Sequence, residues 1–288
     1  MKILVSGGTG LLGQGFLHIL GGATNHDIRC FVRTTSPVER LKGLELSYGD
    51  ARDVDSIERA LRGIDAFVHI AGIEYTRQVL EASIRAGVER LVLVSSTSAH
   101  SRFEFRSAPR LKMEALLRGS ELYWTVVRPS MIYGSELDHN MHKLLRFLDR
   151  WPVFPMFGSG ALWQPVYYED VAQGLFAALD RKEAAGQVYD LPGAQVLSYV
   201  ELVRVAARAL GREVHLVRVP TKPVRQVLKA AEVARIPLPI KSEQVLRLSE
   251  NKAYPYEKAK KELDYAPRTF EEGIALEVKR LREIGMVR

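Results

Sequence analysis

Cysteine is nearly absent from this sequence, since Cys30 is the only one in 288 residues. A single thiol excludes an internal disulfide, and its place in a strand-like apolar run predicts a buried small hydrophobic side chain. Apolar runs of the roughly 20 residues needed to span a bilayer are also lacking. The seven histidines show no metal-ligand spacing, so we expect no metal site. These absences favour a cytoplasmic location.

Acidic residues are outnumbered, because 34 Asp and Glu stand against 41 Lys and Arg, a net charge of +7. The basic residues are scattered, and no arginine-rich block with interleaved aromatic side chains occurs, so nucleic-acid binding is not expected. The basic, amphipathic stretch 221–236 has two interpretations, a helix packed on the core or a segment in peripheral contact with a membrane surface. We favour the packed helix.

A glycine-rich loop lies near the start of the chain. Residues 2–5 (KILV) are followed at 6–13 by SGGTGLLG, a pattern that predicts a buried strand turning into a helix. In such a loop Gly7 permits a tight turn, Gly10 lets backbone N–H groups approach a pyrophosphate, and Gly13 lets the helix pack close to the strand. We therefore predict a dinucleotide with its phosphates at the helix N-terminus; a tight turn without a ligand is the alternative.

Strand and helix patterns alternate through the first half of the chain. Strands are predicted at 28–32, 66–70, 91–95 and 124–127, and helices at 11–20, 54–62, 77–86 and 112–118. This order predicts an α/β protein with a Rossmann-type, doubly wound parallel sheet and ligands at the carboxyl ends of its strands. We expect a dinucleotide-binding domain of residues 1–135 plus about 164–192. A smaller, interleaved C-terminal lobe of about 136–163 and 193–288 would bind substrate, with the ligand cleft between the two.

Further motifs follow the glycine loop: Gly49-Asp50, His69-Ile70-Ala71-Gly72, Ser95-Ser96-Thr97, 128–134 (RPSMIYG), 165–172 (PVYYEDVA) and 263–267 (LDYAP). With these motifs in this order, the chain resembles the short-chain dehydrogenase/reductase superfamily, in its extended branch of nucleotide-sugar epimerases and dehydratases. The loop and the resemblance together predict cofactor contacts at Gly7, Thr9, Gly10, Leu11, Leu12, Gly13, Arg33, Asp50, Ala51, Ala71, Gly72, Ser95, Ser96, Lys112, Pro129 and Ser130.

The resemblance implies a catalytic tyrosine four residues before a lysine, with a hydroxyl side chain from the preceding strand. Lys112 and Thr97 match the lysine and the hydroxyl, but Ala108 stands at the tyrosine position. Because alanine carries no proton, the usual acid/base is absent, and the chain resembles the atypical members related to an accessory subunit of respiratory complex I. Lys112 is expected to bind the nicotinamide ribose, with a solvated helix lysine as the alternative.

Three other side chains are candidates for the missing acid/base. Tyr133 follows the strand that leads toward the nicotinamide region, and with Thr97 and Lys112 it completes our catalytic prediction. His100 lies just past Thr97, and an imidazole titrates near neutral pH. Tyr75 follows the strand at 66–70. For each of the three, a packing or surface role is the favoured alternative.

The nucleotide is predicted from the end of the second strand. An acidic side chain there would bind the ribose 2′-OH of NAD, but this chain has Arg33 followed by Thr34, Thr35 and Ser36. Since a guanidinium pairs with a 2′-phosphate that a carboxylate would repel, we predict NADP(H) over NAD(H). The resemblance places Asp50 near the adenine amino group with Ala51 alongside; a solvated loop aspartate is the alternative.

The sequence gives fewer signals for substrate-binding residues than for cofactor-binding residues. The resemblance implies a diphosphate-binding arginine near 162–165, where this chain reads LWQP, and our substrate candidates are Asn140, Gln164 and Arg247.

The sequence supports two hypotheses about function, an enzyme and a non-catalytic protein. One hypothesis is an NADP(H)-dependent oxidoreductase or epimerase that acts on a nucleotide sugar or similar polar small molecule with a non-standard acid/base. The other is a non-catalytic NADP(H)-binding protein with a structural or sensing role in an assembly. We favour the first.

Overall fold

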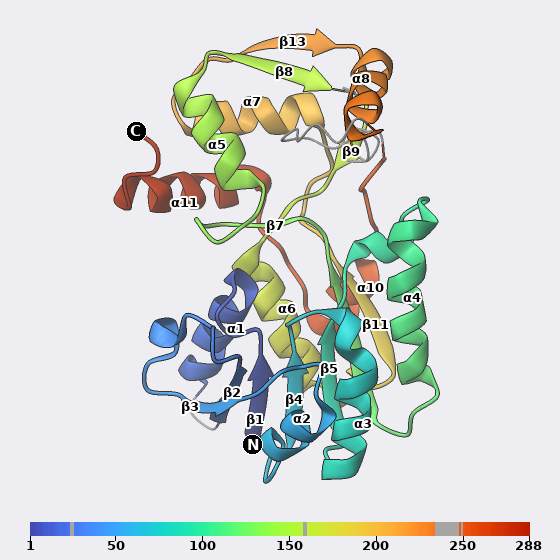
Figure 1. Cartoon of the computed structure of the whole chain (residues 1–288). Helices are drawn as coiled ribbons and strands as arrows, with labels where there is room; N and C mark the ends of the chain where they lie inside the picture. Colours follow the sequence, from blue (N-terminus) through green and yellow to red (C-terminus); the bar gives the residue numbers. More distant parts are fainter. Residues whose placement is uncertain (24–25, 158–159, 234–247, 249) are drawn as a thin grey trace. The chain divides into compact units, whose positions relative to one another are not determined.

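The computed structural model describes residues 1–23, 26–157, 160–233, 248 and 250–288 (Figure 1). The chain divides into two compact units. Unit 1 comprises Met1–Ile132, Val166–Pro192 and Tyr254–Arg268. Unit 2 comprises Tyr133–Pro165, Gly193–Ala253 and Thr269–Arg288. No helix among the described residues is both long enough and apolar enough to cross a membrane.

Unit 1 is built on a seven-stranded sheet in the order β11-β6-β5-β4-β1-β2-β3, with every neighbouring pair parallel. The strand order reverses between β1 and β4, the place where doubly wound sheets bind ligands at their carboxyl ends. This confirms the predicted Rossmann-type fold. The strands are β1 (Lys2–Ser6), β2 (Asp27–Val32), β3 (Glu45–Tyr48), β4 (Ala66–His69), β5 (Arg90–Val94), β6 (Tyr123–Pro129) and β11 (Gln187–Leu191).

Helices cover both faces of this sheet (Figure 1). Because successive strand side chains point to opposite faces, Ile3 and Val5 of β1 pack in one core with α1, α6 and α10, while Leu4 packs in the other with α2, α3 and α4. Cys30 lies in the first core, as predicted, and burial raises the pKa of its thiol to about 12. The helices are α1 (Leu11–Gly22), α2 (Val54–Ala60), α3 (Thr76–Ala86), α4 (Glu104–Arg118), α6 (Tyr168–Asp180) and α10 (Glu257–Leu263).

The segment Tyr254–Arg268 corrects our predicted domain boundaries, which put it in the second lobe. In the structure it belongs to unit 1. The Tyr265 hydroxyl donates a hydrogen bond to the Pro192 carbonyl (2.7 Å), and the backbone N–H and Nε of Arg268 donate to the Asp170 carboxylate (3.0 and 2.9 Å). These contacts join segments that are far apart in sequence, so local patterns did not predict them.

Unit 2 contains two small sheets and four helices among the described residues. β8 (Val153–Phe157) pairs parallel with β13 (His215–Val219), and β9 (Leu162–Trp163) pairs antiparallel with β12 (Leu197–Ser198). The helices are α5 (Met141–Arg150), α7 (Tyr199–Ala209), α8 (Thr221–Val233) and α11 (Phe270–Glu283). β7 (Ile132–Tyr133) and β10 (Val166–Tyr167) lie where the chain passes between the units.

Capping explains where two of these helices begin. Ser198 and Glu201 form a reciprocal capping box at the start of α7, as their spacing in the sequence predicts. Thr269 and Glu272 form the same arrangement at the start of α11. In each box the hydroxyl accepts from a backbone N–H of the first turn, which would otherwise lack a partner.

Two carboxyl groups meet inside unit 2. The Asp138 carboxylate accepts hydrogen bonds from the backbone N–H groups of Asn140 and Met141, both at 2.7 Å, and so caps α5. Glu277 of α11 is fully buried. Its burial, together with the adjacent Asp138 carboxylate, raises the pKa of Glu277 from 4.5 to about 10. Glu277 is therefore protonated at neutral pH.

Replacing Glu277 with glutamine is expected to stabilise the protein at pH 8 by about 2–4 kcal/mol. The folded pKa of Glu277 lies above its unfolded value, so the folded state keeps a proton that the unfolded state releases. The contribution of Glu277 to wild-type stability therefore falls as pH rises from 4.5 toward 10, whereas the neutral amide has no such dependence. Thermal melts from pH 4 to pH 9 measure the difference, with the exposed Glu271→Gln as control. A difference in melting temperature between variant and wild type that does not change with pH would contradict this account.

Candidate functional site

The glycine loop has the shape that the sequence predicts. Gly7 has φ +77°, and a Cβ there would lie 3.0 Å from the Ala71 nitrogen. A Cβ on Gly13 would lie 2.1 Å from the Gly7 carbonyl oxygen, so α1 packs against the loop as closely as a glycine allows. Gly10 begins α1 without any side-chain cap. The first-turn N–H groups of α1 are thus left for an external acceptor such as a phosphate.

A buried histidine holds this loop against the end of β4. His69 is fully buried, with Nδ1 2.7 Å from the Ser6 hydroxyl and Nε2 2.8 Å from the Gly72 carbonyl oxygen. Burial lowers the pKa of His69 to about 4, so its ring is neutral near pH 7. A neutral ring has one donor and one acceptor nitrogen, and Nε2–H donating to Gly72 leaves Nδ1 to accept from Ser6. His69 thereby fixes Ala71 beside Gly7.

A cavity of about 270 Å³ opens at the carboxyl ends of β1, β2, β3 and β4. It is lined by the glycine loop, the end of β2 and the turn after β3, all within unit 1. Several predicted cofactor residues meet here although they are far apart in sequence. These are Gly7, Thr9, Arg33, Asp50, Ala51 and Ala71.

Two arginines line this cavity, Arg33 and Arg52. Arg52 binds Asp50 in a bidentate pair, with Nε 3.0 Å from Oδ1 and Nη2 2.6 Å from Oδ2. This hydrogen bonding lowers the pKa of Asp50 to about 2. The Arg33 side chain forms no ion pair with any residue that the structure describes. Arg52 was not among the predicted cofactor residues, and its only signal in the sequence is a cation two residues after Asp50.

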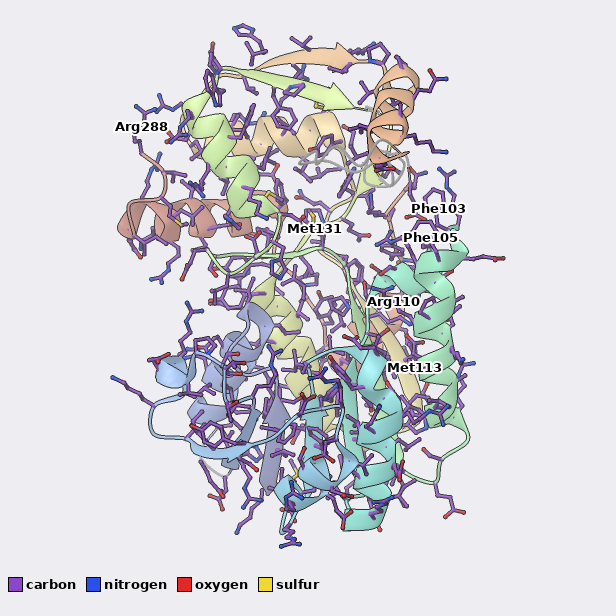
Figure 2. All side chains as sticks on the ribbon, in the orientation of Figure 1. Phe103, Phe105, Arg110, Met113, Met131 and Arg288 are labelled. Carbon is purple, nitrogen blue, oxygen red and sulfur yellow. The ribbon has the colours of Figure 1, made fainter. Side chains whose placement is uncertain are left out.

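The catalytic pattern on α4 does not face the core. Ala108 and Lys112, the positions matched to the family's tyrosine and lysine, are exposed, while Ser107, Glu114 and Leu117 are buried. Met113, labelled on α4 in Figure 2, also packs against the core. The predicted ribose contact of Lys112 therefore stays a prediction, and its exposure fits the alternative of a solvated lysine.

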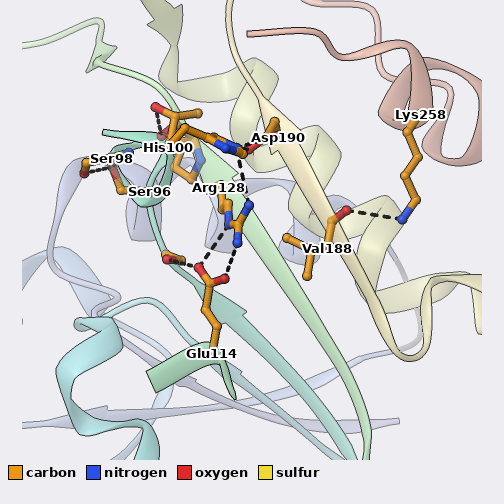
Figure 3. Close-up of polar contacts among 11 residues, drawn as sticks. Ser96, Ser98, His100, Glu114, Arg128, Val188, Asp190 and Lys258 are labelled. Carbon is orange, nitrogen blue, oxygen red and sulfur yellow. Dashed lines mark hydrogen bonds and ion pairs between the residues drawn. The ribbon is translucent and has the colours of Figure 1, made fainter. Parts of the chain in front are cut away.

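The inner face of α4 carries a buried polar network, whereas the positions matched to the family's tyrosine and lysine lie on its exposed face (Figure 3). The Ser95 hydroxyl donates to Glu114 Oε1 (2.6 Å), and Arg128 forms a bidentate ion pair with the same carboxylate. The Glu114 side chain is 1% exposed and that of Arg128 is 9% exposed. Glu114 was not among the predicted residues, although an arginine in a buried strand, Arg128, needs an acidic partner.

His100 extends this network toward solvent. Its Nε2 lies 3.3 Å from Nη1 of Arg128 and 2.9 Å from Oδ1 of Asp190 in β11 (Figure 3). The Tyr254 ring is tilted by 34° to the His100 ring, with centroids 5.6 Å apart. The His100 side chain is still 41% exposed. A titratable group thus lies at the carboxyl edge of the sheet, held by a carboxylate and open to a ligand.

The other two predicted catalytic residues lie in different units. Thr97, in unit 1, is buried and donates to the Pro129 carbonyl at 3.4 Å. Tyr133, in unit 2, is 1% exposed and packs edge-on against Phe270 with centroids 5.4 Å apart. A Cβ on Gly273 would lie 2.1 Å from the Tyr133 hydroxyl. This environment fits the packing alternative for Tyr133, and no single unit holds Thr97, Lys112 and Tyr133 together.

The remaining predicted residues make mostly internal contacts. Ser96 caps the short helix after β5 by accepting from the Ser98 N–H (3.2 Å), and the Ser130 N–H donates to the Leu191 carbonyl (3.4 Å). In unit 2, Asn140 is exposed, and the buried Gln164 donates to the Gly193 carbonyl (2.8 Å). Arg247 lies outside the described residues. Within the described ranges, no group of His, Cys, Asp and Glu side chains is placed to hold a metal ion.

Comparisons with known proteins agree with this site. Residues 7–146 match the family model described as NAD(P)H-binding. The chain is 29% identical over 168 residues to the mitochondrial NADH dehydrogenase [ubiquinone] 1 alpha subcomplex subunit 9 of Dictyostelium discoideum, covering 54% of this chain and 47% of that protein. It is 27% identical over 238 residues to a ceramide reductase of Caulobacter vibrioides, covering 76% and 73% of the two chains. The chain spans about half the length of the complex I relatives that it matches.

The fold has close counterparts among solved structures. A nucleoside-diphosphate-sugar epimerase of Pseudomonas aeruginosa aligns with a TM-score of 0.80 at 20% identity, covering 100% of this chain and 99% of that one. Fold and site together define an NAD(P)-binding protein with an epimerase/dehydratase-like fold. Residues 7–146 are a domain of the NAD(P)H-binding family, and complex I subunit 9 is among the chain's homologues. This confirms the resemblance that the motifs indicate.

Proposed function

We propose that the chain binds NADP(H) in preference to NAD(H) and acts as an oxidoreductase or epimerase on a nucleotide sugar or a similar polar substrate. The observation that carries the cofactor choice is the pair of arginines, Arg33 and Arg52, in the cavity beside the glycine loop. A 2′-phosphate supplies the acceptor oxygens that guanidinium groups bind most strongly. Asp50 holds Arg52 in a bidentate pair in the lining of the cavity, and the N-terminus of α1 would hold the pyrophosphate.

The chemistry divides between cofactor and protein. NADP(H), when bound, supplies or accepts a hydride at its nicotinamide ring. The protein must then move a proton at the substrate, and His100 is the acid/base candidate that the geometry supports best. Asp190 holds its Nε2 in place (2.9 Å), and the exposed part of the ring is open to substrate. Thr97, Lys112 and Tyr133 remain our sequence-based catalytic candidates.

Two departures from the family's catalytic pattern, at Ala108 and Lys112, favour a second function. The exposed Ala108 and Lys112 leave the usual acid/base unformed, and relatives of the chain are named as subunits of NADH dehydrogenase. A non-catalytic NADP(H)-binding protein in an assembly would need the cofactor cavity alone. A cytoplasmic location stays a prediction; the relatives named as complex I subunits are mitochondrial.

Turnover assays separate the two functions. The purified full chain is incubated with NADPH or NADP⁺ and a panel of UDP- and dTDP-sugars, with a ketone-bearing ceramide added because a ceramide reductase is among the relatives. Cofactor absorbance reports net oxidation or reduction, and chromatography of the sugars reports isomerisation. We expect turnover of at least one substrate, lost in His100→Asn while NADPH binding persists. Tight NADPH binding without any turnover would favour the assembly role.

A further inference from the structure

The outward face of α5 in unit 2 carries an unusual combination of side chains. Lys143, Arg146, Phe147 and Arg150 follow the spacing i, i+3, i+4 and i+7, which places them along one stripe of the helix, and Trp151 follows directly after its last residue. The opposite face of α5 is buried in unit 2. Of the two aromatic side chains, Phe147 is 37% exposed and Trp151 is 57% exposed. Two large apolar groups therefore lie in solvent among three cations.

These residues line a cavity of about 720 Å³ between α5 and the segment that ends at Arg288 (labelled in Figure 2). Its acidic residue, Asp149, is paired with Arg212 (3.0 Å) and accepts from the Arg288 backbone N–H (3.2 Å). None of the three cations on the stripe forms an ion pair with a residue in the described part of the chain. The cavity therefore presents an uncompensated positive charge.

We propose that this face of unit 2 docks onto a membrane surface and receives the phosphate of an anionic phospholipid headgroup in the cavity. The cations supply charge complementarity to a phosphate, since lysine and arginine beside a bilayer are attracted by anionic lipids. Membrane docking also explains why the Trp151 and Phe147 rings are exposed, because aromatic rings are favoured at the membrane–water interface. A soluble phosphate ester would account for the charge but not for both exposed rings.

Vesicle co-sedimentation of the full chain tests this proposal. Vesicles of phosphatidylcholine alone are compared with vesicles that also contain phosphatidylglycerol. We expect binding to the anionic vesicles only, weakened by salt. The triple variant Lys143→Glu, Arg146→Glu, Arg150→Glu should bind them roughly 100-fold more weakly, because each cation near the surface contributes about fivefold. Trp151→Ala should bind several-fold more weakly even at high salt.

A matched control distinguishes this site from general charge attraction. The variant Arg59→Glu, Arg118→Glu, Lys182→Glu reverses three exposed cations of unit 1 and should keep wild-type vesicle binding. Circular dichroism and NADPH titration confirm that each variant is folded. An equal loss in the control, or no binding of the wild type to anionic vesicles, would overturn the proposal. So would calorimetric binding of inorganic phosphate or ATP that the α5 triple variant loses, without vesicle binding, since the ligand would then be soluble.

Discussion

Replacing Glu114 with alanine is expected to lower the free energy of unfolding by about 3–5 kcal/mol, because it leaves the buried Arg128 guanidinium without its counter-charge. Glu114 is 1% exposed and also accepts from the Ser95 hydroxyl. The loss should appear in urea unfolding followed by circular dichroism. Glu114→Gln keeps the shape of the side chain but removes the charge, so it should fall between alanine and wild type.

A nearby acidic residue supplies the control for this prediction. Glu121 lies just after α4 and is exposed. Its replacement with alanine should change stability by less than about 0.5 kcal/mol. A Glu114→Ala variant no less stable than Glu121→Ala would show that the Glu114–Arg128 pair does not hold α4 against β6.

The double variant Arg33→Ala, Arg52→Ala is expected to bind NADPH about 100- to 10,000-fold more weakly, while NADH binding changes little. Each hydrogen-bonded guanidinium on a phosphate contributes about 1.5–3 kcal/mol, or roughly 10- to 100-fold in affinity. NADH has no 2′-phosphate, so it lacks the group that both arginines would contact. Calorimetric titration of both cofactors measures the two effects on the same protein.

Single variants sharpen this test. Arg52→Ala removes the partner of Asp50 and leaves that carboxylate uncompensated in the cavity, so it should weaken NADPH binding more than loss of a contact alone. Arg59→Ala, an exposed arginine on α2, should leave both affinities unchanged. Equal losses of NADPH and NADH affinity in the double variant would remove the basis for assigning NADP(H).

Local patterns predicted the parts of this protein that depend on neighbouring residues. The strand-loop-helix at 2–13 could be predicted from the apolar run and three glycines, of which Gly7 and Gly13 lie where a Cβ would be crowded. The capping box of α7 could be found because Ser198 and Glu201 are three residues apart. Six of the predicted cofactor residues line one cavity because parallel strands end at one edge of the sheet.

Features that depend on distant partners could not be predicted in this way. Glu114 acquires its role from Arg128 in β6, and His100 from Asp190 in β11. The exposure of the Lys112 side chain also depends on which side of α4 faces the sheet. A shift of one residue turns that side by about 100°. Only 112–118 was predicted as helical, whereas α4 runs from Glu104 to Arg118 with Pro109 inside it.

The most direct test of the central claim is a calorimetric titration of the full-length chain with NADPH and with NADH at the same ionic strength. The arrangement of Arg33 and Arg52 beside the glycine loop predicts that NADPH binds at least about tenfold more tightly. Binding of NADH as tight as that of NADPH, or tighter, would contradict the assignment of this cavity to NADP(H).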